Sequence, residues 1–254
     1  MPMYRTNGFS SAPLPPPEIR KRSISYAASF GVDTWEWPED LTVVCRALAQ
    51  EFKAHSVREE SGISLCAGQL GVEARWMPDP TFLLNREEYR SFIRQCQEAP
   101  LQKPADYIAY YILDLTPAKQ RQLEELSRRT GLPLVNCMYD LPLEELDRGE
   151  RSYFRPIEHW LDIIANARQM VTDSFHGSVF SIIFNTDFIC YGNEGRGNSR
   201  FDSLLGKLGL MHHLVSADCT MQELPPITNW DEINHTLSEW QQRGLHYLKS
   251  NLNL

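Results

Sequence analysis

The chain has 254 residues, of which 42% are hydrophobic and 11% aromatic, so it can bury a sizeable core and wholesale disorder is excluded. Its formal net charge of -8 argues against a general nucleic-acid binder, although a cleft can still hold a local basic pocket. No apolar run approaches the roughly 18 residues of a transmembrane helix, and no apolar N-terminal stretch indicates a secretory signal. We therefore expect a cytoplasmic protein that is at most peripheral to the inner face of the membrane.

The first 80 residues predict a Pro-rich tail followed by a small α/β unit. Prolines in residues 1–22 predict a chain that is extended or disordered as far as Glu18; they include Pro13, Pro15, Pro16 and Pro17. Strands are expected over residues 23–28, 55–57 and 73–77. Helices are expected over residues 39–54 and 61–70, the second ending at Gly71. One face of the first helix should be buried, namely Leu41, Val44, Cys45, Leu48 and Phe52. About three strands are few for an independent domain.

Residues 81–214 predict a complete alternation of strands and helices, which is typical of a parallel sheet. The expected strands cover residues 107–113, 134–138, 167–172 and 188–190. The expected helices cover residues 87–97, 116–129, 178–184 and 200–208. A further helix should bury Ile157, Trp160, Leu161 and Ile164. Residues 215–254 form a C-terminal segment with one long helix over 230–252.

The strand-turn-helix over residues 167–184 is the most informative stretch. It places His176 in a turn of small and polar residues after a strand. In open α/β sheets ligands bind outside the carboxyl ends of the strands, and a helix N-terminus there attracts an anion. A histidine in this turn can bind an anion or transfer a proton near neutral pH. The alternative is an ordinary strand-turn-helix with a capping serine.

The cysteines predict neither disulfides nor a metal centre. None forms a Cys-x-x-Cys pair or lies at metal-ligand spacing from a histidine; the six stand at positions 45, 66, 96, 137, 190 and 219. We expect reduced, mostly buried thiols, as in cytosolic proteins, and no zinc site.

Five short stretches, taken in order, resemble motifs of the polysaccharide pyruvyl transferase family. They are SYAASFG (25–31), SVREES (56–61), DPT (79–81), TDSFHG (172–177) and RFDSLL with LGL (200–210). The resemblance runs from about residue 23 to about residue 214. It implies transfer of an enolpyruvyl-derived group from phosphoenolpyruvate to a sugar, usually as a cyclic ketal on an exported glycan.

The resemblance also implies an α/β fold of two Rossmann-like units facing a cleft, as in GT-B glycosyltransferases. The units would be residues 23–80 and 81–214, after a tail of residues 1–22. The segment 215–254 would cross back to the first unit. Family members carry a long region with a glycine-containing loop before the first motif. Only Met1 to Arg22 stand there in this sequence, so we expect the first unit to be truncated.

The donor carries a phosphate and a carboxylate, which arginine binds with paired donors. The resemblance places the functional histidine at His176, as acid/base or donor-binding residue. Asp173 would orient it as a neighbouring carboxylate, or cap the next turn. Further contacts to the donor are expected from Arg58, Ser174, Gly177, Ser178, Arg196 and Arg200. The alternatives are a salt bridge from Arg58 to Glu59, Glu60 or another helix, a solvated loop at Arg196, and turn or cap chemistry for the small residues.

Other aromatic and histidine residues are weaker candidates. Tyr107, Tyr110 and Tyr111 form a stripe that is expected in the core. Trp35 and Trp37 could stack on a sugar, although a loop anchor is the favoured interpretation. Adjacent side chains diverge, so His212 and His213 are not expected to share a ligand.

The function expected from these features is phosphoenolpyruvate-dependent pyruvylation of a glycan or lipid-linked sugar precursor, with no metal or cofactor. The expected partners are the donor and the sugar acceptor, and not nucleic acid; a homo-oligomer or a complementing chain could supply the missing half. A non-catalytic glycan- or anion-binding remnant of the family is one alternative. A GT-B-type glycosyltransferase that uses a nucleotide sugar is another.

Overall fold

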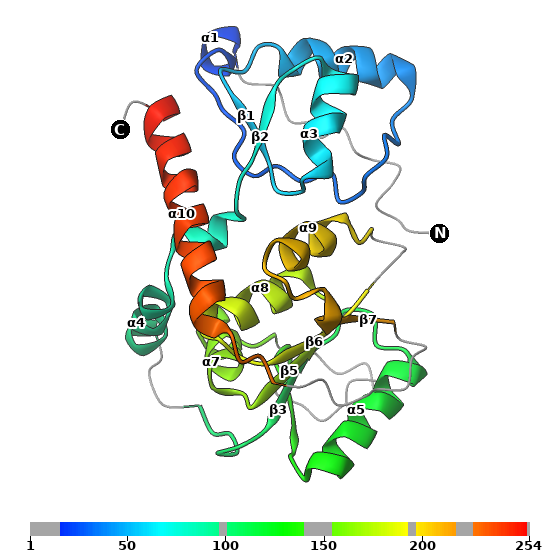
Figure 1. The fold of residues 1–254 in the computed structure, drawn as a ribbon, viewed down its shortest axis with the longest axis vertical. Helices are drawn as coiled ribbons and strands as arrows, with labels where there is room; N and C mark the ends of the chain where they lie inside the picture. The colour runs from blue at the N-terminus through cyan, green and yellow to red at the C-terminus, as the bar shows by residue number, and fades with distance from the viewer. Residues whose placement is uncertain (1–15, 97–100, 140–153, 193–196, 217–225, 253–254) are drawn as a thin grey trace.

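The computed structural model describes residues 16–96, 101–139, 154–192, 197–216 and 226–252 (Figure 1). Within these ranges the fold is mixed α/β and contains two sheets, both parallel. The smaller sheet pairs β1 (His55–Val57) with β2 (Ala74–Trp76). The larger has five strands in the order β4-β3-β5-β6-β7. The α/β alternation predicted from the sequence is thus confirmed.

The strand order of the five-stranded sheet reverses between β3 and β5. Its strands are β3 (Ile108–Tyr111), β4 (Leu134–Asn136), β5 (Gln169–Thr172), β6 (Phe188–Tyr191) and β7 (Leu214–Val215). The chain adds β4 on one side of β3 and then adds β5 on the other side. Such a reversal is a topological switch point, and ligands of open α/β sheets bind at the carboxyl ends of the strands beside it.

Helices cover both faces of this sheet. On one face, α5 (Pro117–Thr130) packs Leu123 and Leu126 against alternate residues of β3 and β5. On the other face lie α7 (Ile157–Asn166), α8 (Phe175–Phe184) and α9 (Ser199–Lys207). Burial on both faces explains the continuous apolar runs of the strands. Thr116 caps α5 and Gly131 ends it in a left-handed conformation, as predicted.

The smaller sheet is accompanied by short helices. They are α1 (Pro17–Arg20), α2 (Glu39–Ala49) and α3 (Ser61–Leu65), which continues as a π-helical turn (Cys66–Leu70) up to Gly71. The prediction of a regular strand over residues 23–28 is wrong. Ile24 and Ala28 form isolated bridges, because Ala27 between them has a positive φ of 47° that interrupts the ladder.

Three other details differ from the sequence prediction. The chain leaves the extended conformation at Pro17, which fits the first position of a helix and opens α1. In α2 the expected apolar face is not fully buried: Val44 is exposed, and the buried residue is Thr42. Ile157 was expected in the core but is exposed at the start of α7.

The thiols match the prediction only in part. Cys66, Cys137 and Cys190 are buried, whereas Cys45 is half-buried and Cys96 is exposed. All five are free, and Cys219 lies outside the described residues. The three tyrosines near β3 lie in the core or at its edge: Tyr107 and Tyr110 are buried and Tyr111 is half-buried.

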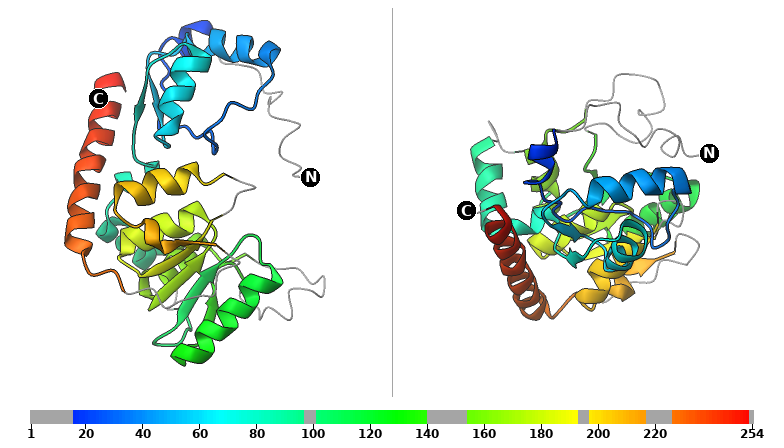
Figure 2. Two further views of the ribbon diagram at one scale, coloured as in Figure 1. Left: turned by 45° about the vertical axis from the view of Figure 1, so that its right-hand side comes forward. Right: turned by 90° about the horizontal axis from the view of Figure 1, so that it is seen from above.

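The long helix α10 (Trp230–Leu252) runs beside both sheets, with α4 (Arg86–Cys96) nearby (Figures 1 and 2). Its Tyr247 hydroxyl donates to the carbonyl of Ser25 at 3.1 Å. Its Trp240 packs edge-on against Trp76 of β2, with ring centroids 5.2 Å apart. The C-terminal helix therefore returns to the N-terminal sheet. Among the described residues no helix is both long and apolar enough to span a bilayer.

Candidate active site

His176 occupies the place that the sequence predicts for it. Strand β5 ends at Thr172, Ser174 caps α8 by accepting from the amide of Gly177, and His176 follows in the first turn. Half of its side chain is exposed. A Cβ on Gly177 would lie 2.9 Å from Cβ of Thr172 and closer still to its hydroxyl, so only glycine allows α8 to start this close to β5.

A buried carboxylate lies beside this histidine. Oδ2 of Asp79 is 3.6 Å from Nε2 of His176 and 2.6 Å from Nη1 of Arg58. Its other oxygen accepts from the amide and hydroxyl of Thr81, and only 2% of the side chain is exposed. Burial alone would raise the pKa of Asp79, but His176, Arg58 and Thr81 together hold it well below the usual range.

Two arginines converge on the ring that precedes His176. The guanidinium carbon of Arg58 lies 4.6 Å from the centroid of Phe175, and that of Arg200 lies 5.9 Å from it. Arg58 follows the end of β1 in the smaller sheet, and Arg200 lies in the first turn of α9, a helix that covers the larger sheet. Of the residues predicted from the sequence, the fold therefore brings together Arg58, His176 and Arg200.

The alternative expected for Arg58, a salt bridge, does form, but its partner is Asp79 at the N-cap of the 3-10 helix Pro80–Leu83 and neither Glu59 nor Glu60. Nε of Arg58 is buried and has no hydrogen-bond partner among the described residues. The same holds for the hydroxyl of Ser61, three residues further on. Both are donors that an anion could accept from.

Glu59, next to Arg58 in the chain, holds the loop over residues 29–31, which approaches the larger unit. It is wholly buried, and its Oε1 accepts from the hydroxyl of Ser29 and the amide of Gly31. The carbonyl of Gly31 approaches Gly197 so closely that a Cβ there would clash with it. Nearby, the amide of Glu60 donates to the hydroxyl of Ser203 in α9 at 3.0 Å. Sequence reasoning missed both Asp79 and Glu59, although both lie within stretches that carry the family resemblance.

Asp173 does not orient His176. Its carboxylate accepts from the amides of Leu113 and Asp114 and from Nζ of Lys119, which lies 2.7 Å away. It therefore fixes the turn between β3 and α5, and the carboxylate next to His176 is Asp79.

The small residues of the turn have mainly structural partners. Ser178 is fully buried, and its hydroxyl faces Ser174 and Cys190, so it cannot reach a ligand. The amide of Gly177 is bonded to Ser174, which itself borders a pocket. Arg196 lies outside the described residues.

The weaker candidates lie away from this cluster. The indole N–H of Trp35 donates to the buried hydroxyl of Thr42 at 2.7 Å, as expected of a loop anchor, and Trp37 is exposed. The rings of His212 and His213 do not diverge as expected; a 3-10 turn brings their centroids to 4.2 Å. Burial lowers the pKa of His213, which contacts the carbonyl of Phe188. Across the described ranges no three His, Cys, Asp or Glu residues are grouped as metal ligands.

A cavity of about 360 Å³ opens beside His176 at the switch point of the sheet. It lies at the carboxyl ends of β3, β4 and β5, which provide Tyr111, Met138 and Ser174. Its remaining walls are Cys137, Phe154, Arg155, Ile157, Trp160 and Phe180. The lining of the cavity is thus mainly aromatic, whereas the cluster on the other side of His176 is charged.

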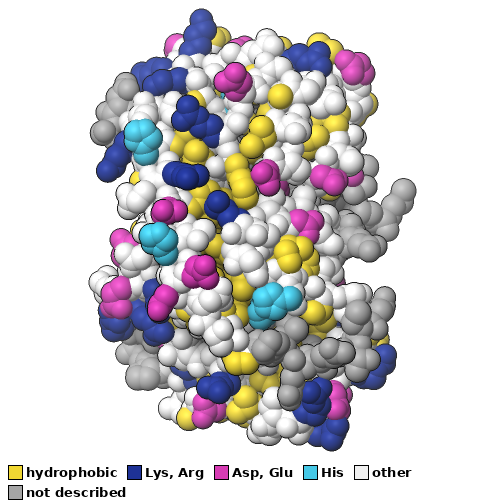
Figure 3. Space-filling view, in the orientation of Figure 1, with side chains coloured by type: hydrophobic (Ala, Val, Ile, Leu, Met, Phe, Trp, Pro, Cys, Tyr) yellow, Lys and Arg dark blue, Asp and Glu magenta, His cyan; other side chains and the backbone are white. Residues whose placement is uncertain are grey.

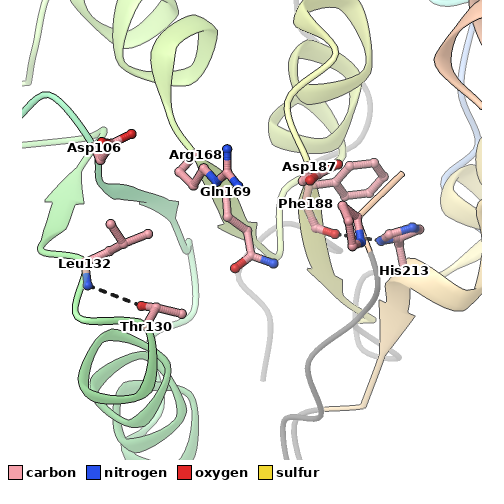
Figure 4. Close-up of a pocket in the computed structure, with 9 residues that line it drawn as sticks. Asp106, Thr130, Leu132, Arg168, Gln169, Asp187, Phe188 and His213 are labelled. Atoms are coloured by element: carbon pink, nitrogen blue, oxygen red, sulfur yellow. Dashed lines mark hydrogen bonds between the residues drawn. The ribbon is translucent and has the colours of Figure 1, made fainter. Parts of the chain in front are cut away.

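A larger cavity, about 570 Å³, lies at the opposite, amino-terminal ends of the strands (Figure 4). Arg168 and Gln169 project into it between Asp106 on one side and Asp187 on the other. Size does not make it the better candidate, because open parallel sheets bind ligands at the carboxyl ends of their strands. It also lacks the convergent cations of the His176 cluster.

Comparison with known proteins agrees with the resemblance. The family model of polysaccharide pyruvyl transferase matches residues 6–195. A search of curated proteins finds no significant match. The matched range begins earlier and ends earlier than the resemblance indicated. It contains Arg58, Asp79 and His176, but it stops before Arg200.

Proposed function

Because the chain belongs to the polysaccharide pyruvyl transferase family, we propose that it transfers a pyruvyl group from phosphoenolpyruvate to a sugar of a glycan or lipid-linked glycan precursor. The observation that carries the proposal is the meeting of Arg58, Asp79 and His176 at the start of α8. It combines a cation, a proton-transferring group and a buried carboxylate that touches both.

The donor's two anionic groups would lie on the charged side of His176. Arg58 and Arg200 flank Phe175 there, and the buried donors of Arg58 and Ser61 add hydrogen bonds. Guanidinium groups match carboxylate and phosphate oxygens in pairs, so these residues would hold the donor across the two sheets.

The proposed chemistry balances without a metal or a redox cofactor. Two sugar hydroxyls form bonds to C2 of phosphoenolpyruvate, and the bond from C2 to the phosphate oxygen breaks. Of the two hydroxyl protons, one is transferred to the methylene carbon of the donor, and the other is transferred to the departing phosphate. The products are a cyclic ketal and inorganic phosphate. His176 would carry these protons, and Asp79 would hold it in place beside the donor.

We further propose a two-unit, GT-B-like arrangement for this reaction, with units over 23–80 and 81–214 and a C-terminal segment over 215–254 that ties them. The contacts of Arg58 with Phe175, of Glu60 with Ser203 and of Tyr247 with Ser25 support it. We also propose that the protein binds a second copy of itself or another chain. Light scattering of the purified protein would reveal a second copy.

The deciding experiment is incubation with phosphoenolpyruvate and a set of bacterial glycans and lipid-linked sugars. Phosphate release that depends on an acceptor, together with a pyruvyl ketal detected by mass spectrometry, is the expected result. A glycosyltransferase would instead consume a nucleotide sugar and leave phosphoenolpyruvate intact. A non-catalytic remnant would bind one of the ligands and convert neither.

A peripheral position on a membrane is also proposed, on the basis of basic side chains near α1 and the end of α10. Figure 3 shows Lys and Arg side chains at this end of the molecule. A cleft there is lined by Lys21, Arg22 and Lys53 together with the exposed Ile19 and Leu252. Basic and apolar side chains together favour an anionic lipid surface.

Sedimentation with phosphatidylglycerol vesicles would test this position. Charge reversal of Lys21 and Arg22 to glutamate should abolish co-sedimentation. Charge reversal of Arg121 and Arg128, which are exposed on α5, changes the net charge equally and should have less effect. Equal effects of the two double variants would remove the proposal.

A further inference from the structure

We infer that the aromatic cavity at the switch point is the acceptor subsite, and that it holds one sugar residue with its reacting hydroxyls toward His176. The inference rests on the proposed pyruvyl transfer and adds to it where, and by which side chains, the acceptor is bound.

The two sides of His176 differ in the ligand that they favour. On the side of Phe175 lie two guanidinium groups within 6 Å of one ring. On the other side the cavity is walled mainly by rings and aliphatic side chains, and the guanidinium of Arg155 in its wall is bonded through Nε to the carbonyls of Asn136 and Tyr139. A ligand with several negative charges would lose hydration against those walls without regaining it, so the donor belongs on the charged side. The cavity is left for a ligand without that charge.

The walls suit a pyranose ring in particular. Trp160 stands at the centre of an aromatic group, with ring centroids 5.3 Å from Tyr111 and 5.1 Å from Phe180 and nearly perpendicular planes. A sugar has an apolar face of C–H groups that packs on such rings and a polar edge of hydroxyls. Ligand sites of this kind combine apolar walls with a few placed polar groups, which here are Arg155, Ser174 and His176.

Trp160 supplies a second and independent observation. It is 9% exposed, and its indole N–H is buried without a hydrogen-bond partner among the described residues. Buried indole N–H groups usually find an acceptor. A hydroxyl of a sugar in the cavity would provide one.

The size of the cavity limits the ligand. At about 360 Å³ it is near the lower end of ligand pockets, which span roughly 300–1,000 Å³. It therefore holds one sugar residue of the acceptor within its walls. His176 borders both the cavity and Asp79, so a hydroxyl bound here would lie next to the residue that transfers the proton.

The test is direct binding of methyl pyranosides of the common hexoses and N-acetylhexosamines. Saturation-transfer NMR in the absence of phosphoenolpyruvate measures this binding. At least one glycoside should bind to the wild type. Trp160→Phe keeps the ring but removes the N–H donor, and it should weaken binding roughly five- to tenfold, as expected for one hydrogen bond. Phe154→Ala should also weaken it; Phe154 is exposed at the cavity rim, so this variant does not depend on core packing.

Two matched variants serve as controls. Trp37→Phe makes the same change at an exposed tryptophan outside the cavity and should bind like the wild type. Phe92→Ala makes the same change as Phe154→Ala at an exposed phenylalanine of α4 outside the cavity, and it should also bind like the wild type.

The outcomes separate this inference from the proposed reaction. If glycosides bind and both cavity variants weaken them, the subsite stands even when no phosphoenolpyruvate is consumed. If phosphoenolpyruvate is consumed but both cavity variants retain the wild-type KM for the acceptor, the acceptor binds elsewhere and the inference is wrong. Binding of none of the glycosides, or displacement of a bound glycoside by phosphoenolpyruvate alone from this cavity, would also overturn it.

Discussion

Nη1 of Arg58 lies 2.6 Å from Oδ2 of Asp79, and the same oxygen lies 3.6 Å from Nε2 of His176. One buried carboxylate thus connects an arginine at the end of β1 with a histidine at the start of α8. Asp79 stands between these two elements in the chain, directly after β2. A side chain in the connection between the two sheets therefore contributes to the position of the arginine relative to the histidine, together with the contact of Arg58 with Phe175.

Replacing Asp79 by asparagine should lower the free energy of unfolding by about 3 kcal/mol. Removal of one partner of a buried ion pair leaves the other charge uncompensated. The side chain of Arg58 is only 14% exposed, so water cannot fully replace the lost carboxylate. Urea denaturation at pH 7 measures the change. As a control, Glu125→Gln breaks the exposed pair with Arg128 on α5 and should leave the midpoint almost unchanged.

The same carboxylate predicts how stability depends on pH. Its pKa in the folded protein lies well below the value of about 3.9 that aspartate has in an unfolded chain. The unfolded chain therefore takes up the proton first. The stabilisation is complete above about pH 4 and is lost as the pH falls from there toward the folded-state pKa. Denaturation between pH 5 and pH 2 should show a shallower loss for Asp79→Asn than for the wild type; parallel curves would contradict this assignment.

Gly177→Ala should destabilise the protein by about 1–3 kcal/mol and displace His176. The added methyl group would overlap the side chain of Thr172, so the first turn of α8 must move away from β5. Gly206→Ala is the matched control, because nothing lies within 4 Å of a Cβ at that position in α9. That variant should be as stable as the wild type or slightly more stable, since alanine favours a helix. Thermal denaturation of both variants gives the comparison.

Amide exchange should be faster over residues 23–77 than over the described residues between 107 and 185. The smaller sheet has two strands of three residues, and Thr42 is the one buried residue of α2. In the larger sheet β6 is buried at every position and β5 at three of its four. Low contact density allows local opening, so protection should follow this difference. Hydrogen exchange read by mass spectrometry would show it, and equal protection of both regions would argue against it.

The elements that periodicity defines were predictable. Strands β3 and β5 and helices α5 and α10 follow from apolar runs, a capping Thr116, a terminal Gly131 and a continuous helical pattern. The break in the segment 23–28 was not predictable, because alanine rarely adopts the left-handed conformation of Ala27.

The site was predictable in its location and only partly in its partners. His176 follows from local signals, since a strand, a turn and a helix are adjacent in sequence. The partner of Arg58 is set by tertiary structure. Asp79 lies 21 residues away in the chain, whereas Glu59 and Glu60 are closer in sequence and were the expected partners. Asp173 shows the reverse error, because adjacency to His176 suggested a role that its contacts with Leu113, Asp114 and Lys119 exclude.

Arg58→Ala and Arg200→Ala should weaken binding of phosphoenolpyruvate more than they slow its turnover. Contacts to an anion that is charged in both ground and transition state contribute to both alike. Calorimetric binding and steady-state kinetics would separate the two effects. Lysine at either position should restore only part of the affinity, because it lacks the paired donors of arginine. Full rescue by lysine would contradict bidentate binding.

His176→Ala should lower the turnover of phosphoenolpyruvate roughly 10²-fold or more, the usual scale for loss of a general acid or base. The histidine is half exposed and lies at the first turn of α8, so its removal should leave the fold intact, which circular dichroism can verify. His235→Ala, at an exposed position on α10, is the matched control and should retain wild-type turnover. If His176→Ala turns over phosphoenolpyruvate at nearly the wild-type rate, the histidine does not transfer the proton. In that case Arg58 or Asp79 would have to transfer the proton. Both are poorly suited to proton transfer, because an arginine stays charged and the carboxyl of Asp79 is strongly acidic.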